Sequence, residues 1–140
     1  MPRQDDPSLA GDIIVLRRIP PSADRVTWDN NDNPIPSSQN FRDSRNDELS
    51  MYIASETTYE AVLTDKGQLL VGFGLVQMTI KEIRDIYAKY SRDIAICRDE
   101  SDDAGPGHIL VCGKPSPKMR DALRECARWV PGRLPTKPPT

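Results

Sequence analysis

The sequence has little of the material from which metal sites and most catalytic sites are built. Its 140 residues contain one histidine, His108, and three cysteines, Cys97, Cys112 and Cys126. A zinc site with several histidines is therefore excluded, and the cysteines lack the C-x-x-C spacing of a structural zinc site. Their odd number and wide spacing argue against a disulfide framework and favour a reducing compartment. We expect no metal and no cofactor, and any histidine general base must be His108.

Neither an excess of one charge nor a long apolar run is present. The chain has 19 basic and 21 acidic residues and a net charge of −2. This balance excludes a protein that binds nucleic acid through bulk positive charge, so nucleic acid is a possible partner that the charge does not favour. No apolar run approaches the roughly 18 residues of a transmembrane helix, and the first residues lack the apolar stretch of a secretory signal. We therefore expect a cytoplasmic protein without membrane contact.

The two ends of the chain differ from its middle. The hydrophobic fraction is only 37%, and 13 residues are proline, which is typical of a compact core with unstructured ends. Residues 1–11 show no apolar periodicity, which predicts a disordered N-terminus. Residues 131–140 contain four prolines. Because proline fixes φ and lacks an N–H group, this tail should be extended or disordered. One α+β domain should therefore occupy residues 12–130.

The apolar pattern of the middle predicts a mixed or antiparallel sheet of about five strands with three helices. Short β-branched runs and period-2 alternation indicate strands, whereas apolar residues at helical spacing after a Ser or Thr cap indicate helices. The predicted strands lie at 13–19, 49–54, 68–78, 94–97 and 108–112, and the predicted helices at 57–63, 80–90 and 116–130. This order favours a small α+β sheet with helices on one face.

A long polar loop is the first candidate binding surface. Residues 29–47 form a stretch without a predicted regular element, which is uncommon in a compact domain unless the loop is functional or disordered. Trp28, Phe41 and Arg42 lie in or beside it, and aromatic and arginine side chains dominate interface energetics. Our leading interpretation is a small prokaryotic accessory protein that binds a macromolecule, most simply another protein, through these anchors.

The connection before the last helix is the second candidate site. Lys114 and Ser116 lie between a predicted buried strand and a helix N-terminus. The unpaired N–H groups and the dipole of such a terminus favour anions. This arrangement gives the alternative that the protein is a nucleotide or anion sensor.

A third hypothesis comes from the stretch 17–63. An arginine near the end of the first strand is followed by the strand Leu49-Ser50-Met51-Tyr52-Ile53-Ala54 and by a helix. This order resembles ADP-ribosyltransferase-type folds, including the RES-type NAD-degrading toxins. The resemblance implies an NAD-consuming enzyme in which Arg17 or Arg18 binds the cofactor, Tyr52 stacks on it and His108 lies near the site. The catalytic glutamate of those enzymes has no clear match here, although Glu56 and Glu60 are nearby.

Overall fold

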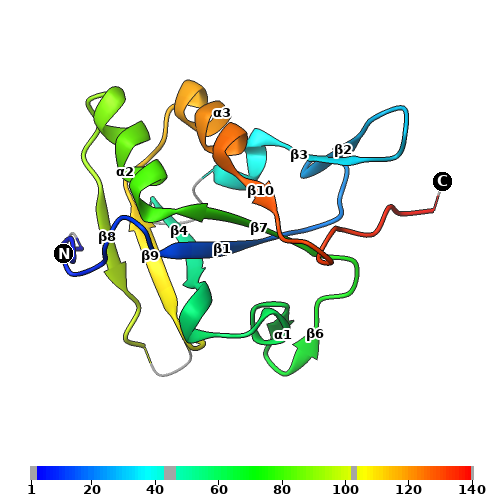
Figure 1. Ribbon diagram of the computed structural model, residues 1–140, viewed down its shortest axis with the longest axis horizontal. Helices are drawn as coiled ribbons and strands as arrows, with labels where there is room; N and C mark the ends of the chain where they lie inside the picture. The colour runs from blue at the N-terminus through cyan, green and yellow to red at the C-terminus, as the bar shows by residue number, and fades with distance from the viewer. Residues whose placement is uncertain (1–2, 43–46, 102–103, 140) are drawn as a thin grey trace.

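The computed structural model describes residues 3–42, 47–101 and 104–139. Its centre is an antiparallel sheet of six strands in the order β10-β7-β1-β4-β9-β8 (Figure 1). These strands are β1 (Ile14–Ile19), β4 (Glu48–Ile53), β7 (Gly74–Thr79), β8 (Ala95–Arg98), β9 (His108–Cys112) and β10 (Arg128–Trp129). Two smaller pairs lie outside the sheet: β2 (Val26–Trp28) with β3 (Pro34–Pro36), and β5 (Thr64–Asp65) with β6 (Gln68–Leu69).

Three α-helices and two short 3-10 helices complete the domain. They are α1 (Tyr59–Val62), α2 (Ile80–Lys89), α3 (Pro117–Cys126), η1 (Ser38–Phe41) and η2 (Ala54–Glu56). The single α+β domain with three helices is confirmed, and the sheet has six strands instead of about five. Among the described residues, no helix is both long enough and apolar enough to cross a membrane.

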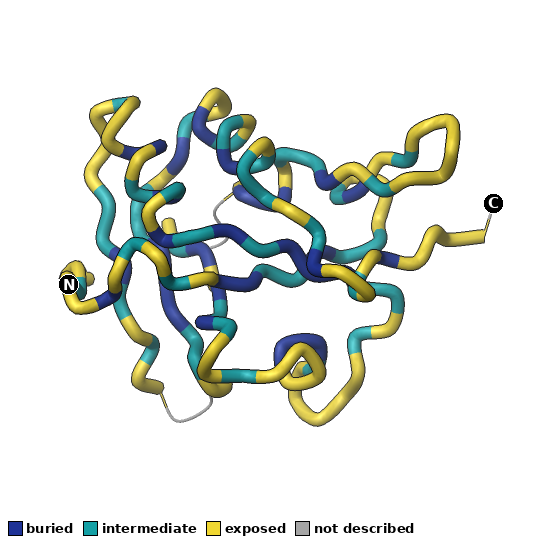
Figure 2. The backbone as a smooth tube through the Cα atoms, viewed as in Figure 1, coloured by how far each residue is buried: buried dark blue, intermediate teal, exposed yellow. Residues whose placement is uncertain are grey.

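The main core lies between the sheet and the two longer helices. Alternate residues of the central strands point toward α2 and α3, as the period-2 pattern of a strand requires. The buried side chains of these strands on this face are Val15, Ile19, Leu49, Met51, Ile53, Ile109 and Val111. Figure 2 shows that buried stretches follow the sheet, whereas its connecting turns are exposed. The opposite face is covered in part by α1, whose Val62 packs with Leu16 and Leu75 of the sheet.

Helix α3 ends earlier than the sequence predicts. It begins as expected, with the Ser116 hydroxyl accepting a hydrogen bond from the Met119 N–H, but it ends at Cys126. Ala127 is extended, and residues 128–129 form the edge strand β10 against β7. The prediction of a helix to residue 130 is wrong because these last residues gain sheet hydrogen bonds, and Trp129 donates its indole N–H to the Pro34 carbonyl.

The prediction of a disordered proline-rich tail is also wrong, because residues 131–139 are ordered. The Leu75 N–H donates to the Arg133 carbonyl, and the Thr136 N–H donates to the Gly72 carbonyl. Arg133 pairs with Glu60 as well. The prolines take positions that need no donor, so their missing N–H groups cost no hydrogen bond. Residue 140 lies outside the described part.

The N-terminal segment covers the edge of β8. Residues 3–11 contain no helix or strand, yet the Asp6 N–H donates to the Ile96 carbonyl and the Asp5 carboxylate accepts the Ile96 N–H. Leu9 is buried in the main core. An exposed strand edge is a template for aggregation, so a segment that satisfies its hydrogen bonds protects the sheet.

Candidate functional site

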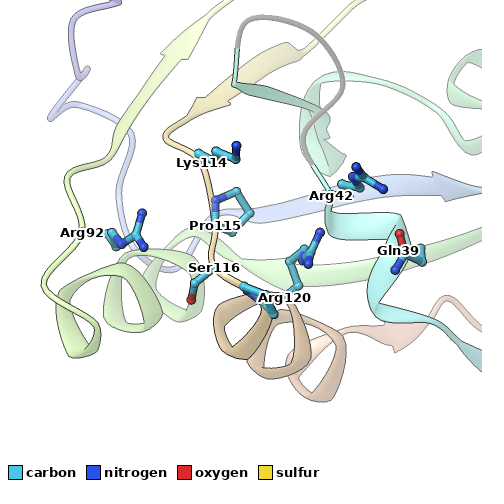
Figure 3. A pocket seen from close by; sticks show the side chains of 8 residues that line it. Gln39, Arg42, Arg92, Lys114, Pro115, Ser116 and Arg120 are labelled. Atoms are coloured by element: carbon cyan, nitrogen blue, oxygen red, sulfur yellow. The ribbon is translucent and has the colours of Figure 1, made fainter.

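A cavity of about 640 Å³ lies beside the N-terminus of α3 (Figure 3). Four separate segments contribute cations to it: the end of η1, the α2–β8 connection, the β9–α3 connection and α3 itself. We call this cavity the basic pocket. Its lining consists of Gln39, Arg42, Arg92, Lys114, Pro115, Ser116, Pro117 and Arg120.

Two buried groups, Phe41 and Tyr87, help to position two of the cations, Arg42 and Lys114. Phe41 is fully buried in the main core and anchors η1 against α3, so Arg42 emerges beside the helix. The chain turns sharply after β9 at Gly113, whose φ is +137°. The Tyr87 hydroxyl donates a 2.7 Å hydrogen bond to the Gly113 carbonyl, which holds this turn and with it Lys114.

The basic pocket brings together four cationic side chains. No carboxylate among the described residues forms an ion pair with any of the four, whereas arginines elsewhere on the surface pair with acidic groups. The pocket lining contains no acidic side chain either. The N-terminus of α3 adds a partial positive charge at its edge. A chain with a net charge of −2 therefore concentrates unpaired positive charge at one place.

The structure brings together residues that the sequence assigned to different hypotheses. Arg42 was predicted as a partner anchor, and Lys114 and Ser116 as an anion site, yet all three line the basic pocket. Arg92 and Arg120 were missed. Arg120 lies one helical turn after Ser116, a spacing that could have placed it over the same terminus. The sequence around Arg92 carries no comparable signal.

The other predicted anchors lie away from this pocket. Phe41 is fully buried, so it offers no surface to a partner. Trp28 is half-buried and packs against the main core. Of the three anchors assigned to the long loop, only Arg42 is exposed, and residues 43–46 of that loop lie outside the described part.

The three residues assigned to catalysis by the resemblance lie in one region. Arg18 and Tyr52 line a cavity of about 610 Å³. The Tyr52 ring lies 5.0 Å from the His108 ring, measured between centroids. His108 Nδ1 is 2.8 Å from an Asp99 carboxylate oxygen, which orients the imidazole.

The glutamates near that region are engaged in ion pairs. Glu56 forms a bidentate ion pair with Arg98, with N···O distances of 2.6 and 2.9 Å. Glu60 forms an ion pair with Arg133, with an N···O distance of 2.6 Å. Neither is placed as an isolated carboxylate for catalysis. The NAD-consuming activity stays a prediction.

The thiols are poor nucleophiles in the folded protein. Burial raises the pKa of Cys112 to about 12, and the nearby Cys97 and Glu48 add to this shift. We expect Cys112 in the native protein to react with iodoacetamide at pH 8 on the order of a thousandfold more slowly than in the unfolded chain, because only the thiolate reacts. Peptide mass spectrometry with and without urea measures this ratio. Equal rates in both states would contradict the expectation.

Within the described part of the chain, no group of three or more His, Cys, Asp or Glu side chains could hold a metal ion. Comparisons with protein-family models, with curated proteins and with solved structures find no match.

Proposed function

We propose that this protein binds a partner that carries a phosphate group, and that the basic pocket holds this group. The observation that supports the proposal is the set of four cations around one cavity, none of which pairs with a carboxylate among the described residues. Guanidinium and ammonium groups are the usual ligands of phosphate, and arginine binds two of its oxygens at once. Three of the cations, Arg42, Arg92 and Lys114, are exposed, so a phosphate on a macromolecule can reach them.

The lining argues against a free nucleoside as the recognised part of the ligand. Small-molecule pockets are mostly apolar and use aromatic side chains to hold rings. The basic pocket has no aromatic side chain in its lining. Recognition through charge alone suits a phosphate that is presented by a larger partner, which is consistent with an accessory role.

Phosphate should stabilise the wild-type protein through this pocket. At a phosphate concentration 100 times the dissociation constant, the gain is about 2.7 kcal/mol, which raises Tm by several degrees. We expect Lys114→Gln combined with Arg120→Gln to make this rise smaller, because two of the four cations of the basic pocket are lost. Differential scanning fluorimetry against sodium chloride at equal ionic strength measures the shift.

Lys89→Gln is the matched control for this experiment. Lys89 is an exposed cation at the end of α2 and does not line the basic pocket. It should leave the phosphate response unchanged. A double variant that responds to phosphate as strongly as the wild-type protein would refute the assignment of the pocket.

A further inference from the structure

A second cavity, of about 210 Å³, contains three arginines and shares no residue with the basic pocket. It lies between β1, the start of β2, β4 and the connection that precedes β7. We call it the arginine cleft. Its lining consists of Arg17, Arg18, Pro20, Arg25, Ser50, Tyr52 and Phe73.

We propose that the arginine cleft binds the phosphate group of a small organic phosphate, at a site independent of the basic pocket. This goes beyond the proposed function, which concerns the other cavity and a larger partner.

Arg17 is the first support for this proposal. Its Nε donates a 2.6 Å hydrogen bond to the Asn40 carbonyl, and its Nη1 donates a 2.7 Å bond to the Ser50 carbonyl. Both partners are neutral, and no carboxylate in the described residues pairs with this guanidinium. Burial, together with the nearby charges of Arg25 and Arg18, lowers the pKa of Arg17 to about 10. A buried guanidinium without a carboxylate partner is unfavourable, and a bound anion would stabilise its charge.

The two neighbouring arginines do not relieve this charge. Arg18 donates from Nη1 to the Val62 carbonyl at 3.2 Å, which is again a neutral partner. Arg25 has one carboxylate nearby, that of Asp24, 3.6 Å from its Nε. The Asp24 side chain is 70% exposed and accepts a hydrogen bond from Ser22, so it faces water more than the cleft. Three cations thus meet at a cavity that one exposed acid only partly compensates.

The size and lining of the cleft define the class of ligand. A volume of 210 Å³ corresponds to about seven water molecules, which is room for one phosphate group but not for a larger polyanion. Three guanidinium groups match a phosphate dianion better than a singly charged carboxylate. Besides the arginines and Ser50, the lining contains Pro20, Tyr52 and Phe73, which give the body of an organic molecule an apolar surface.

The cavity next to the cleft indicates where the body of the ligand extends. Arg18 and Tyr52 line both cavities, so the two adjoin. The larger one is lined by polar side chains, among them Thr64, Asp65 and Lys66. Side chains of this kind can exchange hydrogen bonds with the hydroxyl groups of a ligand. We therefore expect an organic phosphate that carries hydroxyl groups.

A titration followed by NMR of the arginine Nε–H groups tests both sites in one sample. Inorganic phosphate and glycerol 3-phosphate are the probes, and chloride at equal ionic strength is the control. We expect the signals of Arg17, Arg18 and Arg25 to move together, with glycerol 3-phosphate binding at least threefold more tightly than inorganic phosphate. The signals of Arg42, Arg92 and Arg120 report the basic pocket separately.

The outcomes for the two sites are distinguishable. If only the Nε–H signals of the basic pocket shift, the proposed site in the arginine cleft is refuted and the proposed function stands. If only the Nε–H signals of the arginine cleft shift, the proposed function is refuted and the site in the cleft stands. Acetate that binds to the cleft as tightly as phosphate would overturn the phosphate class. Equal affinities for the two phosphates would overturn the extension of the ligand into the adjoining cavity.

Variants of Arg25 complete the test, because among the described residues its side chain contacts only the exposed Asp24 carboxylate and donates no hydrogen bond to the main chain. Arg25→Gln should weaken glycerol 3-phosphate binding at the cleft at least fivefold, and Arg25→Lys should weaken it less. Lys89→Gln should leave it unchanged. The backbone amide spectrum verifies folding of each variant, and an affinity in Arg25→Gln equal to that of the wild-type protein would refute the site.

Discussion

Replacing Phe41 with alanine should lower the free energy of unfolding by about 3–5 kcal/mol. The Phe41 side chain is fully buried, and it belongs to the main core although it comes from a polar loop. Its truncation removes apolar contacts and leaves a cavity where η1 packs against α3. Urea denaturation followed by circular dichroism measures the loss.

Ile35→Ala is the matched control, since Ile35 lies in the same loop but is 41% exposed. Its effect should stay within about 1 kcal/mol, as is usual for an exposed position. If Phe41→Ala were as mild as the control while partner binding was lost, the side chain would be a surface anchor, as the sequence interpretation held.

The sequence predicted the starts of the two longer helices correctly, because a helix start depends on neighbouring residues. The helix predicted at 80–90 after a Thr cap is α2, which begins with a capping box of Thr79 and Glu82, and Ser116 begins α3. The end of α3 was not predicted because it depends on β7, which is distant in the sequence. Residues 128–129 pair with the edge of β7 and so leave the helix. The order of the tail depends on the same strand, which offers hydrogen bonds that proline content cannot reveal.

In the candidate site, too, some residues can be recognised from their neighbours in the sequence, whereas others join the site only through the fold. Lys114 and Ser116 were found because their chemistry can be recognised from neighbouring residues. Arg92 and Arg42 join them only because η1 and the α2–β8 connection approach the α3 terminus, which no spacing in the sequence encodes. Phe41 was misjudged for a related reason, because an aromatic residue in a polar loop can point either into the core or outward.

Gly113→Ala should be the second most damaging change, with a loss of about 3 kcal/mol or more in the free energy of unfolding. Gly113 has a φ of +137°, which L side chains rarely adopt. A Cβ atom there would lie 2.7 Å from the Asp93 carbonyl oxygen and 3.2 Å from Cε2 of Tyr87. The turn must therefore move, and the hydrogen bond from the Tyr87 hydroxyl to the Gly113 carbonyl is expected to weaken with it.

Gly67→Ala separates the two causes of this loss. Gly67 also has a positive φ, +78°, but a Cβ atom there would meet nothing within 4 Å. It should cost about 1 kcal/mol from the backbone conformation alone. If both variants lose the same free energy of unfolding, the close contact with the Asp93 carbonyl does not contribute to the cost of Gly113→Ala. Because Lys114 follows Gly113 directly, Gly113→Ala should also reduce the phosphate-induced rise in Tm, whereas Gly67→Ala should not. The turn that closes β9 thus links the stability of the sheet to the geometry of the basic pocket.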